Sequence, residues 1–200
     1  MRSTLPRHLI LGSTSVYRRQ LLERLGLPFT VQSPGVDETP QPGETPAALA
    51  TRLALAKARA VASQFPDCIV IGCDQVADLH GMSLGKPGDY TRATEQLRRM
   101  RGQTVIFHTA TAVVCHSAGF CSEGLAPVKV QYRDLSDAEI DFYLRKEAPY
   151  DCAGSAKSEG LGIALLKSIE SDDPTALIGL PLIRLSAMLR AAGLPLLGDA

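Results

Sequence analysis

The sequence lacks tryptophan, net charge and any apolar segment long enough to cross a membrane. Its 21 Lys and Arg residues balance 21 Asp and Glu residues, so no overall positive field attracts nucleic acid or an anionic membrane. A membrane helix needs roughly 20 consecutive apolar residues, and no run approaches that length. We therefore expect neither nucleic acid nor a membrane as a partner, and an anionic ligand must meet local basic residues.

Cysteine and histidine are also sparse, and neither shows a spacing typical of a bound metal. The cysteines are odd in number and form no C-x-x-C pair, which favours reduced thiols: Cys68, Cys73, Cys115, Cys121 and Cys152. The four histidines are scattered: His8, His80, His108 and His116. The segment from Met1 to His8 lacks the apolar region of a secretory signal. These observations predict a cytoplasmic protein without a histidine- or thiolate-bound metal.

The order of predicted elements indicates the fold class. The 200 residues, 45% apolar and 21% charged, suit one globular domain of one or two lobes. Apolar runs predict strands at 8–11, 29–33, 68–76, 105–115, 125–133 and 163–169, with a hairpin over 77–84. Helical periodicity and capping residues predict helices at 16–25, 47–64, 90–100 and 136–146, and a final helix opened by Gly179-Leu180-Pro181. Alternating strands and helices favour an α/β fold in a single domain, residues 1–200.

The stretch from Cys68 to Val76 is the most informative of these elements. It is a short apolar run rich in β-branched residues that contains a carboxylate and an amide, Asp74 and Gln75. We read it as a buried strand delivering both side chains to its carboxyl end, where open α/β sheets bind ligands. A strand that simply ends in a solvated turn remains the alternative.

A candidate anion site lies at the start of the chain. The first strand leads through Gly12 into the hydroxyl cluster Ser13-Thr14-Ser15 and a helix beginning near Val16. A helix N-terminus offers free N–H groups and a favourable dipole to a phosphate. Arg18 and Arg19 oppose that dipole in the first turn, a conflict that a bound phosphate would resolve. Without a ligand, the two arginines would be a solvated face.

Three further features are candidates for the same site. Lys57 follows Leu53 on the apolar face of its predicted helix, and it either extends along the surface or points into a cleft. Gly85-Lys86-Pro87 combines a cation with an extended backbone. The segment 151–160 is too polar for a core strand, and such loops in compact domains are often functional.

Together these motifs resemble the Maf family of nucleotide pyrophosphatases, which hydrolyse nucleoside triphosphates to monophosphate and pyrophosphate. The resemblance covers nearly the whole chain in order: Gly12-Ser13-Thr14-Ser15 with Arg18-Arg19, Val36-Asp37-Glu38, Lys57, Gly72-Cys73-Asp74-Gln75-Val76, Gly85-Lys86-Pro87, Ala153-Gly154 and Gly179-Leu180-Pro181. It implies a Maf/ITPase-like fold, with a curved mixed sheet and helices forming two lobes around a central cleft. It also implies a nucleotide substrate, a divalent metal cation (Mg²⁺ or Mn²⁺) and the homodimer that family members often form.

The resemblance also implies roles for individual residues. Asp74 is the expected proton acceptor, and Glu38 with Asp74 is the candidate pair for holding the metal through oxygen ligands. If Asp74 both binds metal and acts as base, these roles overlap. The phosphates would be met by hydroxyls and cations: Ser13, Ser15, Arg18, Arg19, Lys57 and Lys86.

Three positions look like the YceF-type subfamily, which prefers 7-methyl-GTP over the dTTP and UTP favoured by its relatives. They are Tyr17, Gln75 and Glu159. N7 methylation makes guanine cationic, so an aromatic face such as that of Tyr17 would attract it by roughly 0.5–2 kcal/mol. Glu159 could accept from the Watson–Crick edge of guanine. Alternatively, Tyr17 covers its neighbours on a helix surface and Glu159 is a solvated acid. The subfamily usually has Trp at position 17, so Tyr17 offers a smaller aromatic face.

Two other functions remain as alternatives. The first is a dTTP/UTP pyrophosphatase of the same family. The second is a nucleotide-binding regulator of cell division without hydrolysis, which could have lost Asp74, Lys57 and Lys86, whereas this sequence retains all three.

Overall fold

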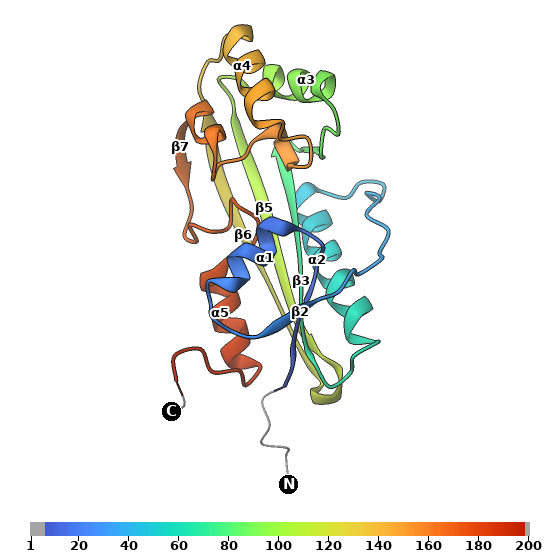
Figure 1. The fold of residues 1–200 in the computed structure, drawn as a ribbon. Coiled ribbons are helices and arrows are strands. Elements are labelled where there is room, and N and C mark those ends of the chain that lie inside the picture. The colour runs from blue at the N-terminus through green and yellow to red at the C-terminus, as the bar shows by residue number, and fades with distance from the viewer. Residues whose placement is uncertain (1–6, 199–200) are drawn as a thin grey trace.

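The computed structural model describes residues 7–198 and confirms the α/β prediction. The segment Met1–His8, on which the absence of a secretory signal was argued, lies mostly outside the described residues. A mixed seven-stranded sheet has the order β2-β1-β3-β5-β6-β7, with β4 also pairing with β3 (Figure 1). The strands are β1 Leu9–Gly12, β2 Phe29–Val31, β3 Ile69–Leu79, β4 Met82–Leu84, β5 Thr104–Cys115, β6 Phe120–Tyr132 and β7 Leu166–Glu170.

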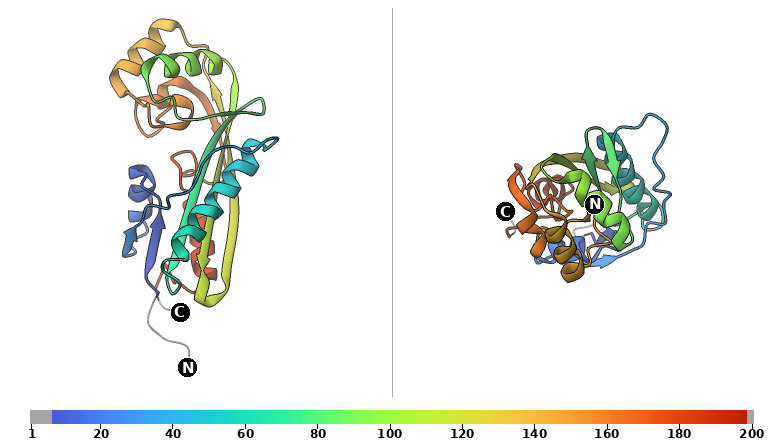
Figure 2. Two further views of the ribbon diagram at one scale, coloured as in Figure 1. Left: turned by 90° about the vertical axis from the view of Figure 1, so that its right-hand side faces the viewer. Right: turned by 90° about the horizontal axis from the view of Figure 1, so that it is seen from above.

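Five α-helices surround this sheet: α1 Val16–Glu23, α2 Pro46–Ala62, α3 Tyr90–Met100, α4 Asp137–Glu147 and α5 Leu182–Ala191. Three 3₁₀ turns complete the described chain: η1 His116–Ala118, η2 Ala153–Ser155 and η3 Leu161–Leu165. Figures 1 and 2 show α3 and α4 at one end of the long strands and α1, α2 and α5 around the other. Between residues 7 and 198, no helix is long and apolar enough to span a bilayer.

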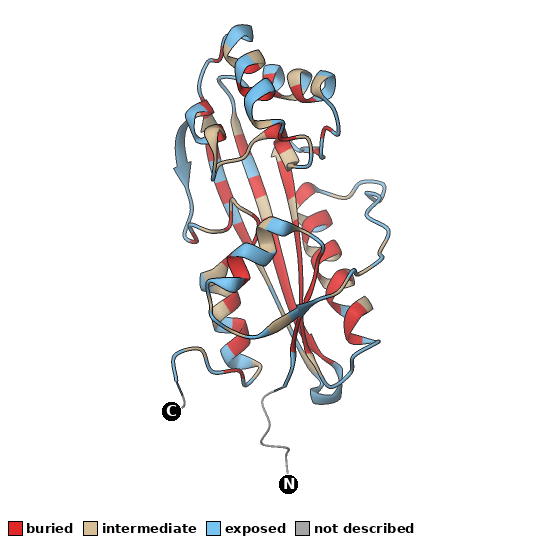
Figure 3. Cartoon of the chain, viewed as in Figure 1, coloured by how far each residue is buried: buried red, intermediate tan, exposed pale blue. Residues whose placement is uncertain are grey.

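The core follows the two faces of the sheet. In the lobe that contains β1 and the first half of β3, α2 packs on one face of the sheet, and α1 and α5 cover the other face. The opposite lobe has its own cluster, in which α3 and α4 cover the far ends of β3, β5 and β6. Buried residues therefore run almost continuously along the central strands (Figure 3). This two-lobed arrangement agrees with the predicted fold.

The boundaries of several elements differ from the predicted ones. The hairpin at His80-Gly81, the helix over 90–100 and the capping box of Ser136 and Glu139 are confirmed. However, β6 begins at Phe120 rather than 125, because residues 120–124 still pair with β5 although Ser122 and Glu123 are polar. The predicted strand 163–169 is a 3₁₀ turn up to Leu165 and a strand only from Leu166. Pro181 occupies the N-cap position of α5, immediately before the first helical residue, Leu182.

The main correction concerns β3, which does not end at Asp74 and Gln75. It continues to Leu79, so both residues lie in mid-strand. β1 pairs with β3 only as far as Gly72, and β4 pairs only from Ala77 onward. β5 pairs with the other edge of β3 throughout this region. Residues 73–76 therefore have one edge without a neighbouring strand, and the apparent strand end is a gap in the sheet.

Because successive strand residues alternate in direction, Asp74 and Gln75 point to opposite faces of the sheet. Asp74 lies on the α2 face, where it contacts Lys57. Gln75 lies on the other face, against the backbone of Ala176 and Leu177. The two side chains therefore reach the same cavity from opposite faces of the strand.

The distance between α2 and β3 is set by Gly72. A Cβ atom built on this glycine would lie 2.2 Å from the carbonyl oxygen of Ala54 and 2.4 Å from the backbone nitrogen of Ala58. Both contacts are with helix backbone, which cannot turn aside as a flexible side chain can. Only glycine permits this approach of α2 to the strand.

Gly72→Ala is predicted to destabilise the protein by about 3 kcal/mol, because the methyl group must push α2 away from β3. Gly124→Ala is the matched control, since a Cβ on this β6 glycine meets no atom closer than 3.9 Å. That control should change stability by less than about 0.5 kcal/mol. Urea unfolding of both variants measures the difference, and equal stabilities would contradict the packing argument.

Candidate functional site

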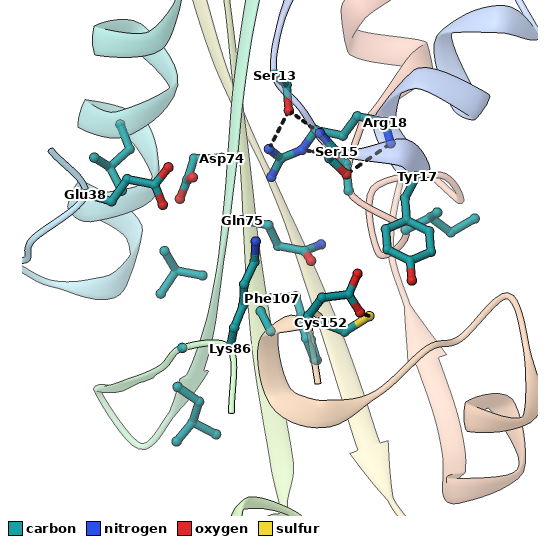
Figure 4. A pocket seen from close by; sticks show the side chains of 18 of the residues that line it. Ser13, Ser15, Tyr17, Arg18, Glu38, Asp74, Gln75, Lys86, Phe107 and Cys152 are labelled. Carbon is teal, nitrogen blue, oxygen red and sulfur yellow. Dashed lines mark hydrogen bonds between the residues drawn. The ribbon is translucent and has the colours of Figure 1, made fainter. Parts of the chain in front are cut away.

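A cavity of about 730 Å³ opens beside the unpaired edge of β3. Its lining comes from segments far apart in the sequence: the β1–α1 turn, the loop before α2, α2 itself, the segment after β4, and the loops around 151–159 and 177–179. Almost every segment singled out by the sequence motifs contributes a residue. Figure 4 shows that Asp74 and Glu38 lie on one side of β3, and Gln75 and Arg18 on the other.

Lys57 and Asp74 form the buried centre of this cavity. The Lys57 ammonium lies 2.6 Å from Asp74 Oδ1 and 2.6 Å from Glu38 Oε1. Lys57 is 5% exposed and Asp74 6%, whereas the Glu38 side chain is mostly solvent-accessible. Lys57 therefore points into the cleft, and the alternative of a surface lysine is excluded. One ammonium is shared by two carboxylates, and each of these retains a second oxygen.

The environments of the two carboxyl groups move their pKa values in opposite directions. Burial raises the pKa of Asp74, and the nearby charges of Lys57 and Arg18 only partly offset it. Burial also raises the pKa of Glu38, but the hydrogen bond and charge of Lys57 outweigh that effect and leave its pKa below the ordinary value. A carboxyl whose pKa is raised is a better proton acceptor than its neighbour. Asp74 thus has the properties of a base, and Glu38 those of a permanently charged partner.

The β1–α1 turn supplies hydroxyl groups and one arginine. Ser13 Oγ accepts from the Ser15 backbone nitrogen and from Arg18 Nη1, each at 3.3 Å, and Ser15 Oγ caps α1 by accepting from the Arg18 nitrogen. Both hydroxyls act as acceptors in these contacts. Their hydrogens bond to no residue in the described range 7–198, so both can donate to an anion in the cavity.

The two adjacent arginines have different positions. Arg18 lies in the cavity wall, where its Nε donates to the Gly179 carbonyl at 3.1 Å and holds the guanidinium in place. Arg19 lies on the solvent side of α1, where it pairs with Glu23 at 3.0 Å and is not part of the cavity lining. The structure therefore brings Arg18, but not Arg19, to the predicted phosphate site. At α1's pitch, one residue turns the side chain by about 100°.

Lys86 enters the cavity from the other lobe. It follows β4 in the Gly85-Lys86-Pro87 segment, and Figure 4 shows its side chain extending toward Gln75. No carboxylate of the described residues lies within 4.0 Å of its ammonium. This cation is therefore available to a ligand, whereas the charge of Lys57 is already shared.

The Gln75 amide is held more tightly than the sequence suggested. Its nitrogen donates to the hydroxyl of Thr109 at 2.9 Å and to the carbonyls of Ala176 and Leu177 at 3.0 Å. The amide hydrogens are consumed by these contacts. Of the amide, only the oxygen can serve a ligand, so Gln75 can accept from a nucleobase but not donate to it.

Tyr17 and Glu159 lie together at the far side of the cavity. Tyr17 is half-buried, and its ring lies beside Cys152 (Figure 4), while Glu159 is exposed on the loop after η2. Desolvation raises the pKa of Tyr17 above its ordinary 10. Desolvation also raises the pKa of the Cys152 thiol to about 12. Both groups are therefore neutral near pH 7, and the negative charge here comes from Glu159 and Asp151.

Sequence reasoning missed the residues that hold the loop between β7 and α5. Asp173, 1% exposed, accepts from the backbone nitrogens of Ile183 and Arg184 at the start of α5, and from the Thr175 hydroxyl at 2.8 Å. This network fixes the carbonyls that contact Gln75 and Arg18. An Asp-x-Thr sequence before a predicted helix could have revealed it, because Asp and Thr commonly satisfy helix N-termini.

A buried carboxylate beside hydroxyls, cations and a cleft in a mixed α/β fold defines a protein that handles phosphorylated ligands. The chain belongs to the Maf family, whose model, described as Maf-like protein, matches residues 8–192. It is 67% identical to the 7-methyl-GTP pyrophosphatase of Polaromonas sp. strain JS666, over 96% of this chain and 88% of the relative. It is also 64% identical to the 7-methyl-GTP pyrophosphatase of Albidiferax ferrireducens (99% and 100% covered) and 58% identical to that of Cupriavidus pinatubonensis (96% and 96%).

We predict that the pKa of Asp74 lies above the ordinary aspartate value and rises further in a Lys57→Met variant. The reason is that desolvation raises it and the lysine charge lowers it. Titration of the Asp74 carboxyl carbon by NMR measures both values, with the exposed Lys146→Met as control. A wild-type pKa at or below 3.8, or one unchanged by Lys57→Met, would contradict the assignment.

The same shift has a consequence for stability. Folded Asp74 binds its proton more tightly than the unfolded chain does. Its stabilising contribution is therefore complete below the unfolded pKa and is lost as pH rises through the folded pKa.

Proposed function

We propose that this protein hydrolyses 7-methyl-GTP to 7-methyl-GMP and pyrophosphate. The observation that carries the proposal is the buried Asp74 carboxylate, paired with Lys57 and facing the cavity that Ser13, Arg18 and Lys86 also line. The relatives that are 57–67% identical to this chain are 7-methyl-GTP pyrophosphatases, and this similarity supports the choice of substrate. The cavity fits a triphosphate, because its cations and hydroxyl donors come from both lobes.

In the proposed reaction, Asp74 takes a proton from a water molecule. The water oxygen bonds to the α-phosphorus, the bond from that phosphorus to the α–β bridging oxygen breaks, and pyrophosphate leaves with the bridging oxygen. Lys57 holds one oxygen of Asp74, so the other oxygen accepts the proton. Arg18 and Lys86 offset the charge on the phosphates, and Ser13 and Ser15 donate to their oxygens. The protein supplies position and charge without a covalent intermediate.

A divalent cation, Mg²⁺ or Mn²⁺, fits this arrangement. Asp74 and Glu38 each use one oxygen for Lys57. Glu38 has its second oxygen to offer, and the second oxygen of Asp74 has two lone pairs, one for the metal and one for the water proton. Hard cations prefer such oxygen ligands. Among residues 7–198, no cluster of three or more His, Cys, Asp or Glu side chains could hold a metal alone. Mg²⁺ commonly binds through one or two carboxylates together with substrate phosphates, which matches this ligand set. When bound, the metal would neutralise phosphate charge and polarise the phosphoryl group.

The base would lie toward Tyr17. A cationic 7-methylguanine is attracted to the Tyr17 ring, and Glu159 or Asp151 can complement its positive charge. The Gln75 oxygen would accept from the amino or N1–H groups of the base, since the amide nitrogen is already engaged. A neutral guanine would keep its hydrogen bond to Gln75 but would lose the attraction of its positive charge to the Tyr17 ring and to the carboxylate of Glu159 or Asp151.

The test of the proposal is pyrophosphate release from a panel of 7-methyl-GTP, GTP, UTP and dTTP, with Mg²⁺, with Mn²⁺ and with chelator. We expect the highest kcat/KM for 7-methyl-GTP and little release after chelation. Equal rates on 7-methyl-GTP, UTP and dTTP would sink the proposed specificity. Absence of release from all four would instead favour a nucleotide-binding regulator.

Asp74→Asn is predicted to lower kcat by roughly 10²–10⁴-fold, because the amide cannot accept the proton of the attacking water. Nucleotide affinity should stay within a few-fold, which calorimetric titration can check. Asp78→Asn is the matched control: Asp78 lies four residues further along the same face of β3, pairs with His108 and does not line the cavity. If Asp74→Asn keeps wild-type turnover, Asp74 is not the base.

A further inference from the structure

The Tyr17 ring already carries a cation, and this cation comes from the protein. The Lys157 ammonium lies 5.7 Å from the centroid of the Tyr17 ring, within the range of a cation–π contact. Tyr17 borders both the main cavity and a smaller adjoining cavity of about 480 Å³, which Lys157 and Glu159 also line. The ring that is proposed to attract a cationic base is therefore already in contact with a positive charge.

Lys157 has a second partner within reach. Its ammonium lies 4.0 Å from Glu147 Oε2, at the limit of an ion pair. That oxygen is buried and bonds to no residue that the structure describes. A buried carboxylate oxygen without a partner is costly, so a full hydrogen bond from Lys157 would be favourable. A movement of about one ångström toward Glu147 would form it.

The backbone around Lys157 is closely packed, whereas its side chain is partly exposed. The backbone N–H of Lys157 donates to the Tyr143 hydroxyl at 3.0 Å. A Cβ on Gly162 would lie 2.5 Å from the Lys157 carbonyl oxygen, so the loop is tightly packed there. Glu147 is held equally closely, since a Cβ on Gly160 would lie 2.4 Å from its Oε2. The Lys157 side chain is about one-third exposed and can move between two fixed partners.

We propose that Lys157 is a specificity-determining residue that moves from the Tyr17 ring to Glu147 when a cationic base binds. Two positive charges on one aromatic ring repel each other, whichever face each occupies. The base can displace the ammonium, and Glu147 receives it. A neutral base meets no such repulsion, so the charge of Lys157 on the ring lowers the preference for the methylated base. This inference rests on the proposed function for the identity of the base.

The test compares the dissociation constants of GTP and 7-methyl-GTP in the Asp74→Asn background, where neither is consumed. The ratio of the two constants isolates the base, because attraction of Lys157 to the triphosphate is the same for both nucleotides. Lys157→Met should raise the preference for 7-methyl-GTP by roughly three- to tenfold. The control is Lys146→Met, which makes the same charge change at an exposed lysine next to Glu147 in the sequence and should leave the ratio unchanged.

Glu147→Gln should lower the preference, because Lys157 loses its alternative partner and stays on the ring. The double variant Lys157→Met/Glu147→Gln should behave as Lys157→Met alone, since Glu147 acts through Lys157. Lys157→Arg keeps the charge and should not reproduce the Lys157→Met effect. In a Tyr17→Ala background the effect of Lys157→Met should vanish. In a crystal of the Asp74→Asn protein with 7-methyl-GTP, the ammonium should lie within hydrogen-bonding distance of Glu147.

The inference is overturned if Lys157→Met leaves the ratio unchanged or lowers it, or if Lys157→Arg has the same effect as Lys157→Met. This outcome differs from failure of the proposed function, in which the unmodified protein releases no pyrophosphate from 7-methyl-GTP or shows no preference for it. The change in ratio between variants can be measured whatever the starting preference is. Thermal unfolding of each variant checks that it is folded.

Discussion

The contact between α2 and β3 at Gly72 determines the geometry of the site. Because this residue has no side chain, helix backbone rests directly on strand backbone, and Lys57, one turn beyond Ala54 on the same helix, comes within 2.6 Å of Asp74. A larger residue would move the helix outward and separate the pair. Burial raises the pKa of Asp74, and Lys57 keeps that rise in check. The pKa of Asp74 thus depends on a packing distance as much as on its charged neighbours.

The gap in the sheet edge is the second constraint. Where β1 has ended and β4 has not yet begun, β3 presents four residues without a neighbour on one side. A strand alternates its side chains, so this gap exposes Asp74 toward α2 and Gln75 toward the loop before α5. One cavity can then reach both faces of the same strand. Within it, the side chains of Asp74 and Gln75 are separated by the thickness of the strand backbone.

Much of the fold could be predicted from the sequence because local signals are strong there. Periodicity, capping residues and the His80-Gly81 turn place most elements within a few residues. The end of β3 could not be predicted, because Asp74 and Gln75 interrupt an apolar run in the same way that a strand end does. Whether they end a strand or face a gap depends on β1 and β4, which are distant in sequence.

The site was predictable in membership but not in geometry. The motifs identified Asp74, Lys57, Ser13, Arg18 and Lys86, all of which line the cavity. Arg19 was not separable from Arg18 without knowing the rotation of α1. The Gln75 nitrogen is occupied through contacts with a segment about 100 residues away in the sequence. The Asp173 network depends on how a buried loop folds onto the start of α5. Local sequence carries little trace of either arrangement.

The carbonyl of Gly179 has a consequence for the order in which the site is assembled. It accepts from Arg18, 161 positions earlier in the chain, and from the thiol of Cys73, 106 positions earlier. The Lys57–Asp74 pair, by contrast, spans only 17 positions. During synthesis the ion pair can form once residue 74, little more than a third of the way along the chain, has left the ribosome. Arg18 acquires its anchor only when almost the entire protein has been made.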